Sequence, residues 1–226
     1  MIAAIIVAAG SSRRMGFDKL AASLGGRTVL ENTVRALAAC GAFQQLVLVA
    51  SRGRWEQSRA WLKEVTKEFR VIVSFAEGGA ERHESVAAGL AALPGKVEWV
   101  AVHDGARPLV CAEDIQRVVE AARRAGAASL AHPVVETVKR ASADAVVTGT
   151  VDREGLWAME TPQVFRFSLL REACQAAIAR GEKLTDEVSA VQAAGFPVQL
   201  VSSSSLNLKI THPQDLRLAE RLLSGL

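Results

Sequence analysis

The sequence predicts an α/β protein with a mostly parallel twisted sheet, helices on both of its faces, and one β-hairpin arm. Strand-like and helix-like segments alternate through the first half of the chain, as they do where crossover helices join parallel strands. The strand-like segments are continuous apolar runs rich in β-branched residues, which is typical of strands buried on both faces. Between residues 133 and 157 this alternation stops, and two short extended runs flank a polar turn.

The first half of the chain supplies most of the expected sheet. A helix begins near Leu30, has apolar residues at helical spacing, and stops at Gly41. Three more helices are expected over residues 55–65, over 82–93 before a Pro-Gly pair, and over 115–122 before Gly126. Strands, each a short apolar run between these helices, are expected over residues 2–8, 46–50, 71–75 and 97–102.

The interruption after residue 133 predicts a hairpin formed by residues 137–140 and 146–151 around a turn at 142–144. Its faces mix valines with charged side chains, so it has little apolar surface to bury on its own domain. An isolated hairpin is only marginally stable in water. We therefore expect residues 134–153 to form an arm that packs on a partner subunit, within a chain that is otherwise one domain over residues 1–226.

The last third returns to helices and short strands. Helices are expected over 167–180 and from Thr185, whose hydroxyl and the following acids suit a helix N-terminus. Strands are expected over 198–201 and 207–210. Residues 211–214 match a capping box with proline in the first turn, which opens a final amphipathic helix.

Composition narrows the class of protein. Half of the 226 residues are apolar, and no apolar run is long enough to cross a membrane. The three cysteines are scattered, which favours a reducing, cytoplasmic location without a zinc site. The formal net charge is +3 and the basic residues form no stripe interleaved with aromatics, so we expect anionic small substrates and neither nucleic acid nor membrane as a partner.

The loop after the first strand, residues 8–19, is the strongest functional feature. Ala8, Ala9 and Gly10 are small enough for backbone N–H groups to approach an anion closely. Arg14 and Lys19 follow, and clustered cations suit a polyphosphate. The loop has neither the G-x-G-x-x-G nor the G-x-x-x-x-G-K-[ST] spacing, so dinucleotide and P-loop sites are disfavoured. An ordinary strand–helix loop with surface arginines is the competing interpretation.

A second candidate site follows the strand that ends near Val102. Asp104 lies at the carboxyl end of that strand, before Gly105 and the stiff Arg107-Pro108 pair. One carboxylate beside a phosphate loop suits Mg²⁺, which takes one or two carboxylates with phosphate oxygens and water. A turn residue that accepts backbone hydrogen bonds is the alternative. His103 has no partner at metal-ligand spacing and is interpreted as structural.

Further candidates are spread along the chain. Gly78-Gly79-Ala80, between a strand and a helix that contains Ser85, could present backbone groups and a hydroxyl to a nucleobase, although a plain helix-entry turn fits equally well. Two cations could hold a second phosphate and three hydroxyls could hold a polyol, unless they are ordinary surface or capping residues. They are Arg153, Lys209, Thr137, Thr161 and Thr185.

Eight motifs, in order from Ile5 to about Leu222, resemble the 2-C-methyl-D-erythritol 4-phosphate cytidylyltransferase family. They are A-A-G-S-S-R-R-M, G-G-A-E-R-x-x-S-V, V-H-D-G-A-R-P, E-T-V-K-R, T-V-D-R-x-G-L-W, T-P-Q-V-F, L-T-D-E and N-L-K-I-T-x-P-x-D-L. The resemblance implies the Rossmann-like fold of nucleotide-diphospho-sugar transferases. It also implies CTP as a substrate, Mg²⁺ as a cofactor, and a homodimer whose arms reach into neighbouring subunits.

The resemblance also implies roles for individual residues. Catalysis would fall to Arg14, Lys19, Arg153 and Lys209, and the metal to Asp104. CTP would be bound by Ala8, Ala9, Gly10, Ser12, Gly79, Ala80, Ser85 and Gly105. The polyol phosphate would be bound by Arg107, Thr137, Thr161 and Thr185. Two positions depart from the pattern: Val7 replaces a frequent proline and Ser12 a frequent glycine, so we expect a change in loop stiffness and retained function.

Three alternatives remain at this point. A ribitol 5-phosphate cytidylyltransferase of the same fold would share the CTP motifs. A nicotinamide-dependent oxidoreductase is disfavoured because G-x-G-x-x-G is missing. A non-enzymatic nucleotide-binding regulator is disfavoured because the chain retains Arg14, Lys19, Asp104, Arg153 and Lys209.

Overall fold

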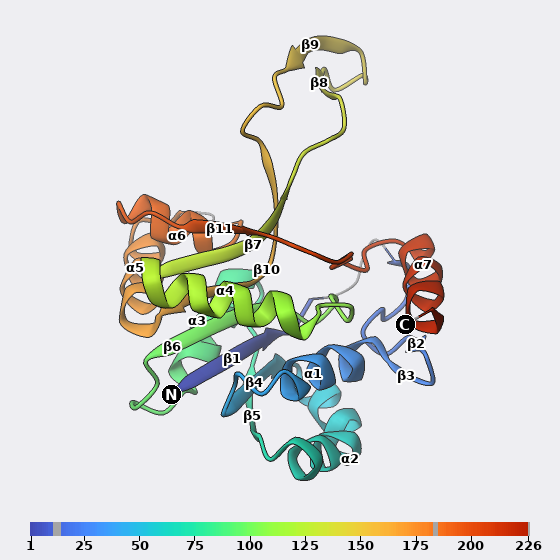
Figure 1. Cartoon of the computed structure of the whole chain (residues 1–226), viewed down its shortest axis with the longest axis vertical. Coiled ribbons are helices and arrows are strands. Elements are labelled where there is room, and N and C mark those ends of the chain that lie inside the picture. The colour runs from blue at the N-terminus through green and yellow to red at the C-terminus, as the bar shows by residue number, and fades with distance from the viewer. Residues whose placement is uncertain (11–14, 183–184, 226) are drawn as a thin grey trace.

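The computed structural model describes residues 1–10, 15–182 and 185–225. The predicted α/β class is confirmed: a seven-stranded sheet has the order β11-β7-β10-β6-β1-β4-β5, and every strand except β10 runs in the same direction (Figure 1). The strands are β1 (Ile2–Val7), β4 (Gln45–Ala50), β5 (Ile72–Glu77), β6 (Trp99–Asp104), β7 (Ala127–Pro133), β10 (Trp157–Arg166) and β11 (Gln199–Ser202).

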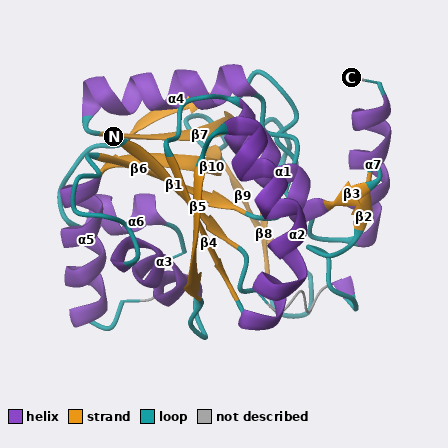
Figure 2. Ribbon diagram, turned by 90° about the horizontal axis from the view of Figure 1, so that it is seen from below, coloured by secondary structure: helices purple, strands orange, loops and turns teal. Residues whose placement is uncertain are grey.

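Helices cover both faces of this sheet (Figure 2). They are α1 (Val29–Ala39), α2 (Arg52–Phe69), α3 (Arg82–Ala91), α4 (Ala112–Ala125), α5 (Phe167–Ala179) and α6 (Glu187–Ala193). The last helix, α7 (Pro213–Ser224), lies to one side of the sheet (Figure 2). Side chains alternate along β1, so Ile6 packs in the core beneath α1, α2 and α4, whereas Ile5 packs in the core beneath α3, α5 and α6. No helix in the described residues is long and apolar enough to cross a membrane.

The sequence analysis missed two strands of this sheet, β7 and β10, and the more informative case is β10. It lies antiparallel between β6 and β7, and its register with β7 shifts between Met159 and Gln163. Glu160, Thr161 and Gln163 are polar yet buried here, and a proline in the run argues against a central strand. The polar residues made this segment look unlike a buried strand. The structure allows the strand because these side chains form hydrogen bonds with residues on other elements.

Two other local expectations are wrong. Residues 207–210 form no strand, although the Ile210 N–H donates to the carbonyl of Ala106 at 2.8 Å. The last helix is capped one residue later than predicted: His212 is the N-cap and Asp215, not Gln214, is the third helical residue. The Asp215 carboxylate accepts from the N–H groups of His212 and Thr211, both at 2.8 Å, and a charged acceptor binds such donors more strongly than an amide.

The predicted hairpin consists of β8 (Val138–Ala141) and β9 (Val147–Val151), and it projects far from the sheet (Figure 1). Val135, Val146 and Val147 on this arm are each more than 60% exposed. A short ribbon of β2 (Ser23–Leu24) and β3 (Arg27–Thr28) precedes α1. Packing of the arm on a partner subunit stays a prediction.

Candidate active site

A cleft of about 680 Å³ lies where β1 and β6 end and α3 begins. Carboxyl ends of parallel strands are the usual ligand site of such sheets, because the loops there converge. The cleft brings together most of the residues that the sequence analysis assigned to the nucleotide, together with both lysines and the carboxylate. Those on its lining are Ala9, Gly10, Lys19, Gly79, Ala80, Ser85, Asp104, Gly105 and Lys209.

Other predicted site residues lie elsewhere. Ala8 is buried behind the cleft, and its N–H donates to the carbonyl of Val49 at 2.8 Å. Thr137 and Arg153 are exposed on the arm, where the Arg153 guanidinium donates to the carbonyl of Val135. Thr185 is exposed before α6, and its hydroxyl contacts the Ser189 hydroxyl at 3.1 Å. Ser12 and Arg14 lie outside the described residues. The roles assigned to all of these stay predictions.

Two glycines, Gly78 and Gly79, let the loop after β5 come into contact with the loop after β1. A Cβ on Gly78 would lie 2.2 Å from the Cβ of Ala9, and one on Gly79 would lie 2.4 Å from the Cβ of Glu84. Neither position therefore has room for a side chain. The Gly79 N–H donates to the Ser85 hydroxyl at 3.2 Å, which ties the loop to α3. The close approach forms one wall that is mostly backbone, suited to a flat base or to phosphate oxygens.

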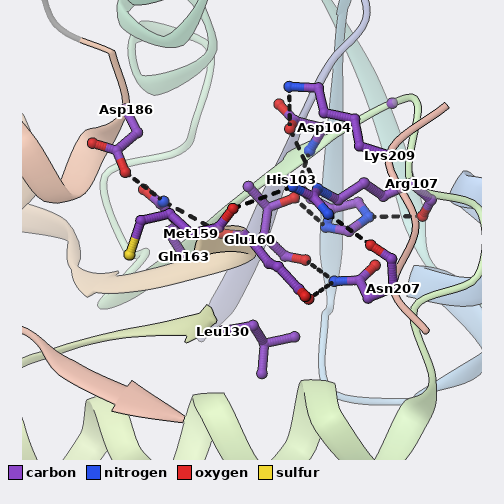
Figure 3. Close-up of polar contacts among 12 residues, drawn as sticks. His103, Asp104, Arg107, Leu130, Met159, Glu160, Gln163, Asp186, Asn207 and Lys209 are labelled. Carbon is purple, nitrogen blue, oxygen red and sulfur yellow. Dashed lines mark hydrogen bonds and ion pairs between the residues drawn. The ribbon is translucent and has the colours of Figure 1, made fainter. Parts of the chain in front are cut away.

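Asp104 is the electrostatic centre of the cleft (Figure 3). Its carboxylate lies 2.8 Å from the ammonium of Lys209 and 3.5 Å from the guanidinium groups of both Arg82 and Arg107. Burial acts to raise the pKa of Asp104, but Lys209, Arg82 and Arg107 outweigh burial and hold that pKa well below its usual range. The carboxylate therefore stays ionised and acts as an anchor for cations, not as an acid.

Arg107 and Thr161 lie beneath the cleft floor. The Arg107 guanidinium donates to the carbonyls of Asn207 at 2.6 Å and Met159 at 3.4 Å. These hydrogen bonds join the loop after β6 to the segment that contains Asn207 and to β10. The Thr161 hydroxyl accepts from the Asp104 N–H at 3.0 Å and contacts Nδ1 of His103 at 3.0 Å. Both side chains are buried, and this geometry favours positioning of the Asp104 loop over direct contact with a polyol.

His103 is structural, as predicted, and its neighbours fix its tautomer. Nε2 lies 3.2 Å from the carbonyl of Arg107, which can only accept, so Nε2 carries the proton. Nδ1 then accepts from the Thr161 hydroxyl. Complete burial lowers the pKa of His103 to about 4, so the ring is neutral at physiological pH.

This neutral ring predicts a dependence of stability on pH. Between pH 6.5 and pH 4 the unfolded chain protonates His103 and the folded chain does not, so acidification favours unfolding. We expect the free energy of unfolding to fall by on the order of 3 kcal/mol more in wild type than in His103→Gln, which keeps a donor but cannot titrate. Denaturant titrations of both proteins between pH 7 and pH 4 measure this difference, because the carboxyl groups, Asp104 included, are present in both proteins and their contribution cancels in the comparison. Parallel pH profiles for the two proteins would contradict it.

The sequence analysis gave no role to Arg82 or Glu187. Arg82 lines the cleft, and its guanidinium binds the buried carboxylate of Glu187 through two hydrogen bonds of 2.6 and 2.9 Å. Glu187 starts α6, so this ion pair joins α6 to the start of α3 and to Asp104. Arg82 stands in the G-G-A-E-R motif, but its partner is 105 residues away, and no local pattern indicates the pair.

Lys19 and Lys209 are held by the same short segment. The Lys19 ammonium donates to the carbonyl of Ile210 at 2.8 Å, and Lys209 is the residue before it. A mostly parallel sheet that ends in a backbone-walled cleft with two lysines is typical of α/β proteins that bind phosphorylated ligands, the nucleotidyltransferases among them.

Comparison with known proteins gives the family. The family model for 2-C-methyl-D-erythritol 4-phosphate cytidylyltransferase matches residues 2–225, and the chain belongs to this family. An enzyme of that name from Desulforamulus reducens is 41% identical over 224 residues, covering 98% of this chain and 95% of the relative. A bifunctional IspD/IspF enzyme from Desulforudis audaxviator is 44% identical over 227 residues, but this chain spans only 56% of its length.

A solved structure agrees with this assignment. The 2-C-methyl-D-erythritol 4-phosphate cytidylyltransferase from Thermus thermophilus superposes with a TM-score of 0.82 at 36% identity, covering 99% of this chain and all of that one. The resemblance stated from the eight motifs is thereby confirmed.

Proposed function

We propose that this protein transfers the cytidylyl group of CTP to 2-C-methyl-D-erythritol 4-phosphate and releases pyrophosphate. A phosphate oxygen of the polyol substrate forms a bond to the α-phosphorus of CTP, and the bond between the α-phosphorus and the bridging oxygen to the β-phosphate breaks. Family membership together with the lysine-bearing cleft at the end of β1 carries this proposal.

The charges of the reactants explain the composition of the cleft. The attacking phosphate is already an anion and needs no base, but two polyanions must be brought into contact. Catalysis is therefore mainly positioning and charge neutralisation. Lys19 would face the CTP phosphates, and Lys209, held beside Asp104, would receive the phosphate of the polyol.

Asp104 suits Mg²⁺ as part of a shared site. Among the described residues no group of three or more His, Cys, Asp or Glu side chains could hold a metal alone. Mg²⁺ needs no such cage, because it keeps waters and takes phosphate oxygens beside one or two carboxylates. Asp104 would supply the carboxylate once Lys209 turns to a substrate phosphate, and the bound ion would neutralise charge on the departing pyrophosphate.

Asp104→Asn is expected to raise the Mg²⁺ concentration needed for half-maximal activity steeply, because a neutral amide is a poor ligand for a hard cation. Titration of activity with Mg²⁺ at saturating CTP measures the effect. Glu81→Gln is the matched control, because Glu81 is a second carboxylate on the lining of the cleft and is the N-cap residue of α3. If the Mg²⁺ titration of Asp104→Asn is unchanged, Asp104 is not a ligand of Mg²⁺ and only holds Lys209 in place.

The substrate assignment is tested by pyrophosphate release. We expect release with CTP and 2-C-methyl-D-erythritol 4-phosphate, and far less with UTP or ATP. Ribitol 5-phosphate, assayed beside the methylerythritol phosphate at equal concentration, separates the two cytidylyltransferase activities. Comparable turnover with UTP or ATP, or faster turnover with the ribitol phosphate, would overturn the assignment.

We also infer a cytoplasmic homodimer joined through the arm. The exposed Val135, Val146 and Val147 provide apolar surface that a second copy would bury. The arm also carries Thr137 and Arg153 away from the cleft of their own chain (Figure 1), so these residues would serve the cleft of the partner. The free thiols of Cys40, Cys111 and Cys174 are consistent with a reducing compartment.

A further inference from the structure

We propose that Asn207 is a positioning residue that sets both cleft lysines, Lys19 and Lys209, through its hydrogen bond to the buried carboxylate of Glu160. The inference deepens the proposed function, on which its kinetic test rests. Asn207 opens the N-L-K-I-T motif, and the carboxylate of Glu160 lies behind the cleft on β10 (Figure 3).

The segment that bears Lys209 has no regular structure to hold it. Residues 203–211 belong to neither a helix nor a strand, so hydrogen bonds to other elements, from both side chains and backbone, fix their course. Asn207 is 3% exposed and makes three hydrogen bonds to the rest of the protein. Its amide nitrogen donates to the Glu160 carboxylate at 2.8 Å and to the carbonyl of Thr161 at 2.7 Å. Its own carbonyl accepts from Arg107 at 2.6 Å.

These contacts require an amide at position 207. Both amide hydrogens are donated, and each goes to an acceptor that cannot donate in return. The Asn207 Oδ1 atom is buried and has no hydrogen-bond partner among the described residues, so the side chain is placed by its donors alone. Aspartate has the same shape, but it offers no donor and would place a second carboxylate against Glu160.

Glu160 is itself fixed from the other side. It is 5% exposed, and its second oxygen lies 2.7 Å from Nδ1 of His132 on β7. The register shift in β10 begins just before Glu160. One continuous chain of contacts therefore runs from β7 through Glu160 to Asn207.

The effect reaches both lysines because they depend on the residues that follow Asn207. Lys209, two residues on, places its ammonium 2.8 Å from Asp104. Ile210 donates its N–H to Ala106 and accepts at its carbonyl from Lys19, both at 2.8 Å. A shift of the Asn207 backbone would move the Lys209 side chain and the carbonyl that holds Lys19 together.

The test uses Asn207→Asp and, because that change adds a charge, also Asn207→Ala. Each variant is expected to lower kcat on the order of a hundredfold, because a displacement of catalytic side chains by about 1 Å has an effect of this size. The KM for CTP should change little. In the double variant Asn207→Asp with Glu160→Gln, the glutamine amide donates to the new carboxylate while its oxygen still accepts from His132. Only part of the lost kcat should return in that double variant, because the carbonyl of Thr161 still lacks its donor and faces the new carboxylate. The net charge is unchanged.

Asn32→Ala is the matched control for the loss of a structural asparagine. Asn32 also donates to two acceptors, the carbonyls of Leu24 and Thr28, but it lies outside the cleft. It should lower thermal stability and leave kcat unchanged. Equal losses of kcat in Asn32→Ala and Asn207→Ala, or no recovery in the double variant, would overturn the proposal.

A readout without substrate separates this inference from the proposed function. Nuclear magnetic resonance of ¹³C-methylated lysines, assigned with Lys→Arg variants, reports the surroundings of each ammonium group. The Lys19 and Lys209 signals should shift in Asn207→Asp and return part of the way in the double variant, with the Lys63 signal unchanged throughout. Unmoved Lys19 and Lys209 signals would overturn the inference, whereas wild type inactive with CTP would overturn only the proposed function.

Discussion

Lys19→Ala is expected to lower kcat by about a hundred- to a thousandfold, a loss of about 2.7–4 kcal/mol in transition-state stabilisation. Lys19 lines the cleft, and its ammonium is held by the neutral carbonyl of Ile210. Because Lys19 lies on the lining of the cleft, its charge can act on the negative oxygens that form as pyrophosphate leaves. Because that charge grows during the reaction, the effect falls on kcat more than on the binding of CTP.

Steady-state kinetics with saturating polyol phosphate, combined with calorimetric titration of CTP, separates the two effects. Lys63→Ala is the control, because Lys63 is an exposed lysine on α2 outside the cleft. It should leave kcat and CTP affinity unchanged. A variant Lys19→Ala with normal kcat and a raised KM for CTP would show that Lys19 binds the ground state and the transition state equally.

Recovery of activity in mixed dimers is the second large effect expected. Lys19→Ala and Arg153→Ala should each be nearly inactive as pure homodimers. If Arg153 serves the cleft of the partner, then one cleft of a mixed dimer carries both lesions and the other carries none. Refolding an equimolar mixture makes about half of the dimers mixed, so about a quarter of the wild-type activity should return.

The matched control for this experiment mixes Lys19→Ala with Lys209→Ala. Both lysines line the cleft of the same chain, so each cleft of a mixed dimer keeps one lesion. That mixture should stay inactive. If the mixture of Lys19→Ala and Arg153→Ala also stays inactive while subunit exchange is shown by differential tagging, Arg153 acts within its own chain and the role of the arm is overturned.

The sequence predicted most of the sheet because the signals there are local. Ile5 and Val47 lie in apolar runs that can only be buried strands, and the loops at their carboxyl ends meet for topological reasons. Local patterns failed where long-range contacts decide the structure. β10 is a strand although Glu160 and Thr161 are polar, because His103, His132 and Asn207 satisfy them from distant parts of the chain.

In the candidate site, too, local motifs were predictive and long-range contacts could not be foreseen. Glycine and lysine motifs placed Gly79 and Lys19 at the cleft, since each follows the end of a strand. Thr161 was expected to contact the polyol, yet its hydroxyl is used inside the protein, and a threonine in a motif does not reveal which way it faces. The pairing of Arg82 with Glu187 joins residues on separate helices, which no spacing in the sequence encodes.

The length of the arm determines how far its tip lies from the sheet, because the arm continues the direction of β7 and β10. These antiparallel neighbours leave the sheet together, and the Val134 N–H still bonds to the carbonyl of Leu156 at 2.9 Å where the arm begins (Figure 1). Two added residues in each strand of the arm would move its tip by about 7 Å, since each residue of a strand advances about 3.4 Å. Such a change would leave the cleft as it is, because the cleft is built at the ends of β1 and β6. In the proposed homodimer, the length of the arm would therefore set the spacing between the two subunits, whereas the frame that holds the lysines of each chain does not depend on that length.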